Sequence, residues 1–175
     1  MAILASAFKE FSTGKLRQFV ERIEFCLGKL SEEQIWARPN AASNSAGNLC
    51  LHLSGNVRQW ILAGVAGQPD LRRRDEEFAA QGGVGREQLL VRLRGTVEEA
   101  CAVIEGLPET RLLEVVKPQN YEVTVLAAVY HVVEHFAMHT GQILLLTKAA
   151  TGEDLGFYRH LSGGGTGGGA GEPLP

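Results

Sequence analysis

The chain has 175 residues, of which 45% are hydrophobic and 21% are charged, and its formal net charge is −3. This length allows a substantial core within one domain, and the charge balance gives no sign of the extended basic surface of a nucleic-acid-binding protein. No segment reaches the ~18 uninterrupted apolar residues of a membrane-spanning helix. We therefore expect one globular domain with neither a nucleic-acid partner nor a membrane partner.

The N-terminal sequence and the cysteines favour a cytoplasmic location. The first residues, MAILASAFKEF, lack the basic segment and the long apolar stretch of an export signal. The three cysteines, Cys26, Cys50 and Cys101, are odd in number, widely spaced and without a C-x-x-C motif. Such cysteines are typical of reduced thiols in a reducing compartment.

Four segments have apolar residues at intervals of three and four, the periodicity of amphipathic helices. The predicted helices span about residues 4–27, 45–65, 86–105 and 123–150. Between the first two, Ser31 to Gln34 has a capping-box pattern that predicts a short helical turn carrying Trp36. Ser43 and Asn44 are candidate caps for the second helix.

The connections between these helices are polar. Residues 68–85 are charged and then Gly-rich, so we expect a long surface loop in which the run from Arg72 to Glu77 is solvated. Long loops are often functional, and this one could form the edge of a pocket. Residues 109–121 are short and irregular, and the pair Val115–Val116 is too brief to predict a sheet.

Four amphipathic helices without a convincing strand predict an all-α four-helix bundle with long connecting loops. The interior of such a bundle commonly holds metal sites built from facing helices. We expect the bundle to span residues 1–161. The Gly-rich residues 162–175 have nothing to bury and predict a flexible tail.

Three of the five histidines, His131, His135 and His139, follow one another at intervals of four in the last helix. With His135 at zero and ~100° per residue, the other two lie at about −40° and +40°, and Gln142 lies at about −20°. An adjacent pair can bind one metal ion. All three cannot, because the outer two are ~12 Å apart along the axis. The alternative interpretation is that they are polar side chains satisfied in the core.

The second helix has a polar strip centred on His52, with Asn48, Asn56 and Gln59 within about 40° of it. This strip is either the wall of a pocket or a set of solvated or inter-helix hydrogen-bonding groups. His52 and an adjacent histidine pair of the last helix would supply three imidazoles. A three-histidine set with a free position is typical of catalytic metal sites, and imidazole binds several metals.

The segments NLCLHLSGN and HVVEHFAMHTGQI, in this order and spacing, resemble the DinB-like or YfiT-like superfamily of metal-dependent proteins, in an uncharacterised branch. The resemblance implies a four-helix bundle, usually a homodimer, with one divalent metal ion, nickel or zinc first and iron or manganese as alternatives. By position in the family motif, the ligands are His52, His135 and His139. Helical geometry alone leaves the choice between the two histidine pairs open.

Six further residues are candidates to line the pocket or to orient the ligands. They are Asn48, Asn56, Gln59, His131, Glu134 and Gln142.

Relatives in this superfamily include S-transferases of low-molecular-weight thiols and thiol-dependent isomerases, so the resemblance implies a transferase acting on a thiol and an electrophilic small molecule. A metal ion at the open position would stabilise the thiolate. One alternative is a non-catalytic, metal-stabilised dimer that serves as a binding or stress-response module. A metal-dependent hydrolase or an H-x-x-E-H protease with Glu134 as its base are further alternatives.

Overall fold

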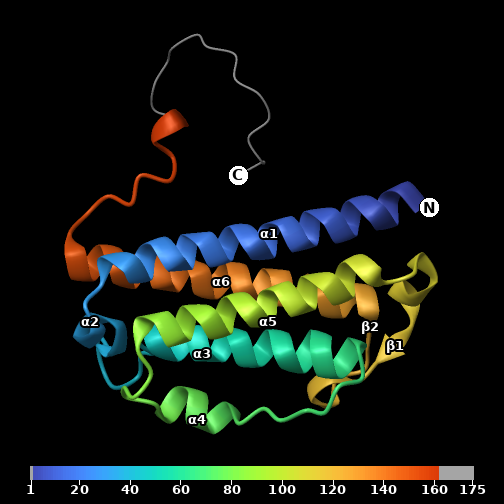
Figure 1. Cartoon of the computed structure of the whole chain (residues 1–175), viewed down its shortest axis with the longest axis horizontal. Helices are drawn as coiled ribbons and strands as arrows, with labels where there is room; N and C mark the ends of the chain where they lie inside the picture. The colour runs from blue at the N-terminus through green and yellow to red at the C-terminus, as the bar shows by residue number, and fades with distance from the viewer. Residues whose placement is uncertain (1, 162–175) are drawn as a thin grey trace.

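The computed structural model describes residues 2–161, in which four long helices pack around one core (Figure 1). They are α1 (Ala2–Lys29), α3 (Ala46–Val57) with its continuation η1 (Arg58–Val65), α5 (Arg86–Gly106) and α6 (Val125–Thr151). Both α1 and α3 contact α5 and α6. The predicted all-α bundle is confirmed, whereas the predicted tail, residues 162–175, lies outside the described residues.

The core draws apolar side chains from all four helices. The largest fully buried ones include Leu27 of α1, Leu53 of α3, Leu93 of α5 and Phe136 of α6. Each buried side chain of this size contributes roughly 1.5–3 kcal/mol. The three cysteines are free and buried, and burial raises the pKa of Cys50 to about 12, so its thiol is unreactive at neutral pH.

Short elements connect the long helices. They are α2 (Glu32–Trp36), α4 (Arg74–Ala79), the 3-10 turns η2 (Glu109–Leu113), η3 (Pro118–Asn120) and η4 (Arg159–Leu161), and the strands β1 (Val115–Val116) and β2 (Val123–Thr124). The predicted capping box of α2 is present, since Ser31 accepts a hydrogen bond from the backbone of Gln34 and the Gln34 side chain accepts one in return.

The expectation that Val115–Val116 is too brief for a sheet is wrong, because β1 pairs with β2 in antiparallel register, Val115 opposite Thr124. This pair ties the segment to the start of α6. No helix among residues 2–161 has the length and apolar character needed to cross a membrane.

The second long helix differs from the regular α-helix predicted for residues 45–65. Its N-cap is Ser45, which forms a capping box with Asn48, in place of the candidates Ser43 and Asn44. From Arg58 to Val65 it is a π-helix. His52, Asn56 and Trp60 follow one another at intervals of four, which places them on one side of the helix, and all three line one cavity.

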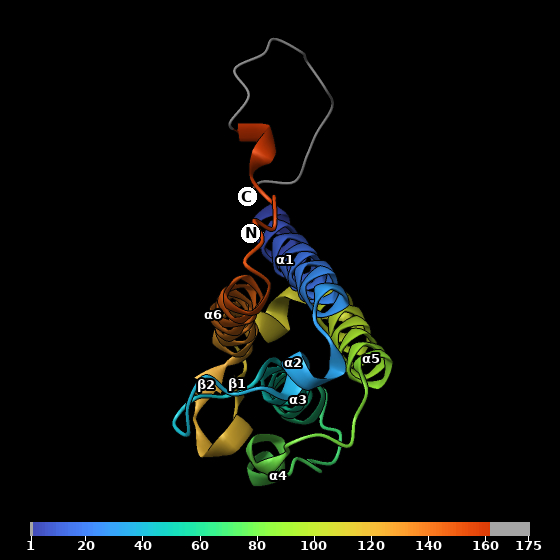
Figure 2. The same cartoon turned by 90° about the vertical axis from the view of Figure 1, so that its left-hand side faces the viewer.

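The predicted solvated loop 68–85 is instead partly buried against the bundle. It contains α4, which lies on the outer side of α3 (Figure 2). Asn48 donates hydrogen bonds to the backbone carbonyls of Glu77 and Ala80 at 2.9 and 2.8 Å. Arg38 donates to the carbonyl of Phe78. Within the charge run, residues 73–76 are exposed as predicted, but Arg72 as a whole residue is half-buried and Glu77 is only 5% exposed.

Candidate metal centre

Three imidazole rings converge between α3 and α6. The Nε2 atom of His135 lies 3.1 Å from Nε2 of His52 and 3.2 Å from Nε2 of His139. One ion held tetrahedrally by nitrogen atoms at 2.0–2.1 Å would separate those nitrogens by roughly 3.3 Å. These two separations fit ligation of a single ion, and all three ligand atoms lie within 4.8 Å of one another.

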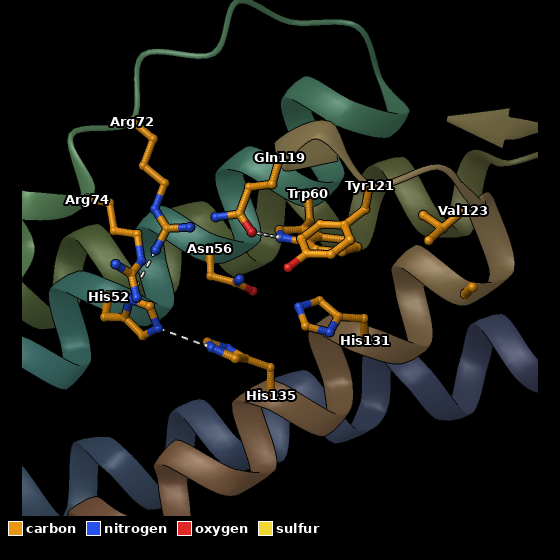
Figure 3. A pocket seen from close by; sticks show the side chains of 11 residues that line it. His52, Asn56, Trp60, Arg72, Arg74, Gln119, Tyr121, Val123, His131 and His135 are labelled. Atoms are coloured by element: carbon orange, nitrogen blue, oxygen red, sulfur yellow. Dashed lines mark hydrogen bonds between the residues drawn. The ribbon is translucent and has the colours of Figure 1, made fainter. Parts of the chain in front are cut away.

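The helices explain why these three histidines meet. His135 and His139 occupy adjacent turns of α6, and α3 packs against α6 so that His52 points toward His135 (Figure 3). His131, one turn earlier, packs on Trp60 with ring centroids 3.9 Å apart. The structure thus brings together the set that the family motif selected, and metal binding by this set stays a prediction.

His52 is oriented by a buried carboxylate on α4. Its Nδ1 lies 3.2 Å from Oε2 of Glu77, and Arg72 donates to both oxygens of Glu77 at 2.9 Å. Arg72 also comes within 3.0 Å of the same Nδ1. When Nε2 is a ligand, Nδ1 carries the proton and only the carboxylate can accept it. Glu77 then keeps the lone pair of His52 directed at the other two rings.

The charge state of Glu77 suits this task. Burial by itself raises the pKa of the Glu77 carboxyl, but hydrogen bonds from Arg72 and His52, together with their charges, outweigh burial and lower its pKa below the ordinary value. The carboxylate is therefore ionised at neutral pH and available as a hydrogen-bond acceptor.

The rings of His139 and His135 differ in whether their Nδ1 atoms have a hydrogen-bond partner. Nδ1 of His139 lies 2.7 Å from Oε1 of Gln142, to which it can donate a hydrogen bond. Nδ1 of His135 is buried and has no partner within residues 2–161. Two of the three rings thus have Nδ1 beside an acceptor, as ligating histidines ordinarily do.

The environment keeps the α6 histidines uncharged. Burial, followed by the neighbouring histidines and Arg72, lowers the pKa of His135 to about 3. Burial also lowers the pKa of His139. Neutral imidazole is the form that binds a metal ion, so the residues present fit one.

A glycine makes room for the carboxylate behind His52. A Cβ atom on Gly55 would overlap Oε1 of Glu77 and lie 2.8 Å from its Cδ and 2.9 Å from Nε of Arg72. Any larger residue at this position of α3 would displace the pair that orients His52.

A cavity of about 440 Å³ is lined by two of the three rings, those of His52 and His135 (Figure 3). Its aromatic wall is formed by Trp60, Tyr121 and His131. Trp60 donates a hydrogen bond from Nε1 to Oε1 of Gln119 at 3.2 Å, and Gln119 has φ 51°, in the left-handed region that non-glycine residues seldom adopt. The cavity also presents polar and charged side chains, among them Asn56, Arg72 and Arg74. An aromatic wall combined with groups that can orient a ligand is typical of small-molecule sites.

The six remaining candidates lie in different places. Asn56 and His131 line the cavity. Gln59 accepts from Arg72 at 2.8 Å and donates to Asp70 at 2.7 Å. Gln142 contacts His139, Asn48 holds the α4 segment, and Glu134 is exposed to solvent outside the cavity.

Comparison with known proteins agrees with this architecture. Residues 13–152 match the family model described as mycothiol-S-transferase. The chain belongs to this family. The predicted resemblance to DinB-like proteins is thereby confirmed.

Two solved structures share the fold of this mycothiol-S-transferase family member. A conserved protein from Enterococcus faecalis has a TM-score of 0.69 at 19% identity, over 82% of this chain and 97% of that one. A DinB-like protein, YjoA, from Bacillus subtilis has a TM-score of 0.64 at 19% identity, over 84% and 96%. No curated protein matches the chain.

The sequence interpretation missed Arg72, Glu77, Gln119 and Tyr121 as site residues. Arg72 and Glu77 belong to a charge run, and whether such a run is buried depends on how the rest of the chain packs against it. One signal was present: Phe78 is an aromatic residue next to these charges, and its ring lies 4.6 Å from that of His52.

The low pKa of His135 predicts how the stability of the metal-free protein depends on pH. Folded His135 stays neutral down to about pH 3, against an ordinary pKa of 6.5. Between about pH 3 and pH 6.5, His135 is protonated in the unfolded chain but not in the folded protein. Its contribution to the free energy of unfolding is therefore complete above pH 6.5 and decreases as the pH falls below that value. We expect a loss of roughly 1–2 kcal/mol between pH 7 and pH 5, measured by urea unfolding with a chelator.

His135→Gln is the control for this pH dependence, because glutamine does not titrate. Its unfolding free energy should fall less over the same interval. Identical slopes for the wild type and this variant would contradict the prediction.

The contact between Glu77 and His52 predicts that Glu77→Gln weakens metal binding. The variant loses the ionised acceptor for Nδ1 of His52, and such losses typically reduce metal affinity by about 10- to 100-fold. Glu76→Gln is the matched control, since Glu76 is the preceding residue of α4 and its side chain is 69% exposed. Equal affinities of the two variants in competition titrations with a chelating dye would rule out this role.

Proposed function

We propose that this chain is a metal-dependent S-transferase in which His52, His135 and His139 bind one divalent ion, nickel or zinc. The adjoining cavity then binds a low-molecular-weight thiol, which the family description suggests is mycothiol, together with an electrophilic small molecule. The observation that carries this proposal is the convergence of three imidazoles, all ligand atoms within 4.8 Å of one another, beside a cavity.

The residues around the centre have distinct tasks in this proposal. When bound, the ion supplies a positive charge that stabilises thiolate over thiol. Glu77 and Gln142 accept hydrogen bonds from the Nδ1 atoms of His52 and His139, which fixes the orientation of both rings. The aromatic wall with Trp60 excludes water from one side of the thiol, because its rings are packed against each other.

The lining of the cavity supports transfer over hydrolysis. Among the described residues that line it there is no carboxylate, and the carboxylate of Glu77 is already paired with Arg72 and His52. A carboxylate base to activate water is therefore missing from the cavity wall.

The H-x-x-E-H protease interpretation has less support. It requires His131 and His135 as ligands and Glu134 as the base. His131 packs on Trp60 instead, and Glu134 is exposed outside the cavity.

We also propose that the protein is a homodimer formed through α1 and α6. Both helices expose large apolar side chains, with Phe11 55%, Tyr130 62% and Leu145 68% exposed, and extensive apolar surface marks interaction sites. A non-catalytic dimer stabilised by metal is the second candidate function. The cavity beside the histidines favours the enzyme, because a purely structural metal site is closed.

Elemental analysis of untagged protein tests the ligand set. The wild type should contain about one divalent ion per chain, and His52→Ala and His139→Ala should lose it because three ligands are needed for the site. His131→Ala is the matched control on α6 and should keep the ion. Retention by the first two variants, or loss in His131→Ala, would show that the ligand set is wrong.

The same four proteins should then be assayed for thiol consumption with mycothiol and a chromogenic electrophile. We expect transfer by the metal-loaded wild type, none by His52→Ala or His139→Ala, and reduced transfer by metal-loaded His131→Ala, which lacks part of the aromatic wall. A metal-loaded wild type that transfers no thiol would favour the non-catalytic dimer.

A further inference from the structure

Two asparagines on one face of the second long helix are equally buried but bonded in opposite ways. Asn48 is 0% exposed and Asn56 is 3% exposed. The Oδ1 atom of Asn48 accepts from Ser45, and its Nδ2 donates to two carbonyls of the α4 segment. The Oδ1 atom of Asn56 has no hydrogen-bond partner anywhere in residues 2–161. Asn48 is thus satisfied by the fold, and Asn56 is not.

The unpartnered amide faces the reaction cavity. Asn56 lies one turn after His52 and lines the cavity together with His52, His135 and Trp60 (Figure 3). A buried polar group without a partner loses its hydrogen bonds to water and gains none in return. A ligand bound in the cavity would supply the missing hydrogen bond.

We propose that Asn56 positions the thiol cosubstrate by accepting a hydrogen bond from an N–H group that lies close to the sulfur atom. A carboxamide offers both a donor and an acceptor, and with Oδ1 unbonded, rotation about the Cβ–Cγ bond can turn it to the ligand. This inference rests on the proposed function, because it places the sulfur at the histidine centre. It adds the residue that positions the thiol and the group on the thiol that this residue would contact.

A pair of small thiols isolates this hydrogen bond. N-Acetylcysteamine carries an amide N–H near its sulfur, and 2-mercaptoethyl acetate is the matching ester without that donor. Binding is followed by the near-ultraviolet charge-transfer absorption of thiolate on the Co²⁺-loaded protein. We expect the wild type to bind the amide roughly tenfold more tightly than the ester, as the loss of one buried hydrogen bond implies.

Two variants remove the amide of Asn56 in different ways. Asn56→Leu keeps a similar shape, and Asn56→Ala avoids any steric conflict. In both, we expect the preference for the amide thiol to fall to within about twofold, while Co²⁺ content stays at the level of the wild type.

Urea unfolding of the metal-free proteins supplies a measurement that does not depend on the metal or on activity. Replacing an unsatisfied buried amide with a hydrocarbon of similar shape costs little or is stabilising, whereas replacing a satisfied one leaves its partners unbonded. Asn56→Leu should therefore keep or raise the urea midpoint, and Asn48→Leu, the matched control on the same helix face, should lower it.

The outcomes separate this inference from the proposed function. Equal affinity of the wild type for the two thiols, or an unchanged preference in both Asn56 variants, overturns the role of Asn56 alone. A midpoint lowered in Asn56→Leu as much as in Asn48→Leu assigns Asn56 to the fold and overturns it as well. A wild type that binds no Co²⁺, or gives no charge-transfer band with either thiol, overturns the proposed function and this inference with it.

Discussion

The buried ion pair between Arg72 and Glu77 is the interaction on which the candidate site depends. Both side chains are nearly inaccessible, 3% and 5% exposed, and the pair joins the α4 segment to α3 through His52. Burying an ion pair adds little net stability, but removing one partner leaves an uncompensated charge in the interior. The pair therefore links the position of the α4 segment to the orientation of His52. Gly55 leaves room for it, because a Cβ atom there would overlap the carboxylate of Glu77.

Burial keeps the two histidines of α6 able to bind a metal ion. It lowers the pKa of His135 and His139, which leaves their nitrogen lone pairs unprotonated. The two long helices that supply the rings are rigid elements of the bundle core. Of the two side chains that contact Nδ1 atoms of the rings as acceptors, Glu77 comes from the connecting segment α4, whereas Gln142 comes from α6 itself.

The bundle was predictable from sequence because its signals are local. Periodicity located the four helices, the Ser31 to Gln34 pattern located a cap, and the four-residue spacing put His135 and His139 on one face. The choice of this pair required the resemblance to a family. The role of Glu77 was not predictable, since a charge run has the same pattern in a solvated loop and in a segment folded against a helix. The β1–β2 pair was missed because two residues on each side carry no periodicity.

The π-helical segment Arg58–Val65 has a consequence for how this site is recognised in related sequences. A π turn holds more residues than an α turn over the same length of axis, so the helix accommodates an additional residue while the segments before and after it keep their places. Deleting one residue between Arg58 and Val65 would restore the regular pitch and rotate the residues that follow relative to those before. In an alignment with relatives whose helix is regular here, the segment would coincide with a single-residue insertion in the middle of a helix, a position where insertions are otherwise rare.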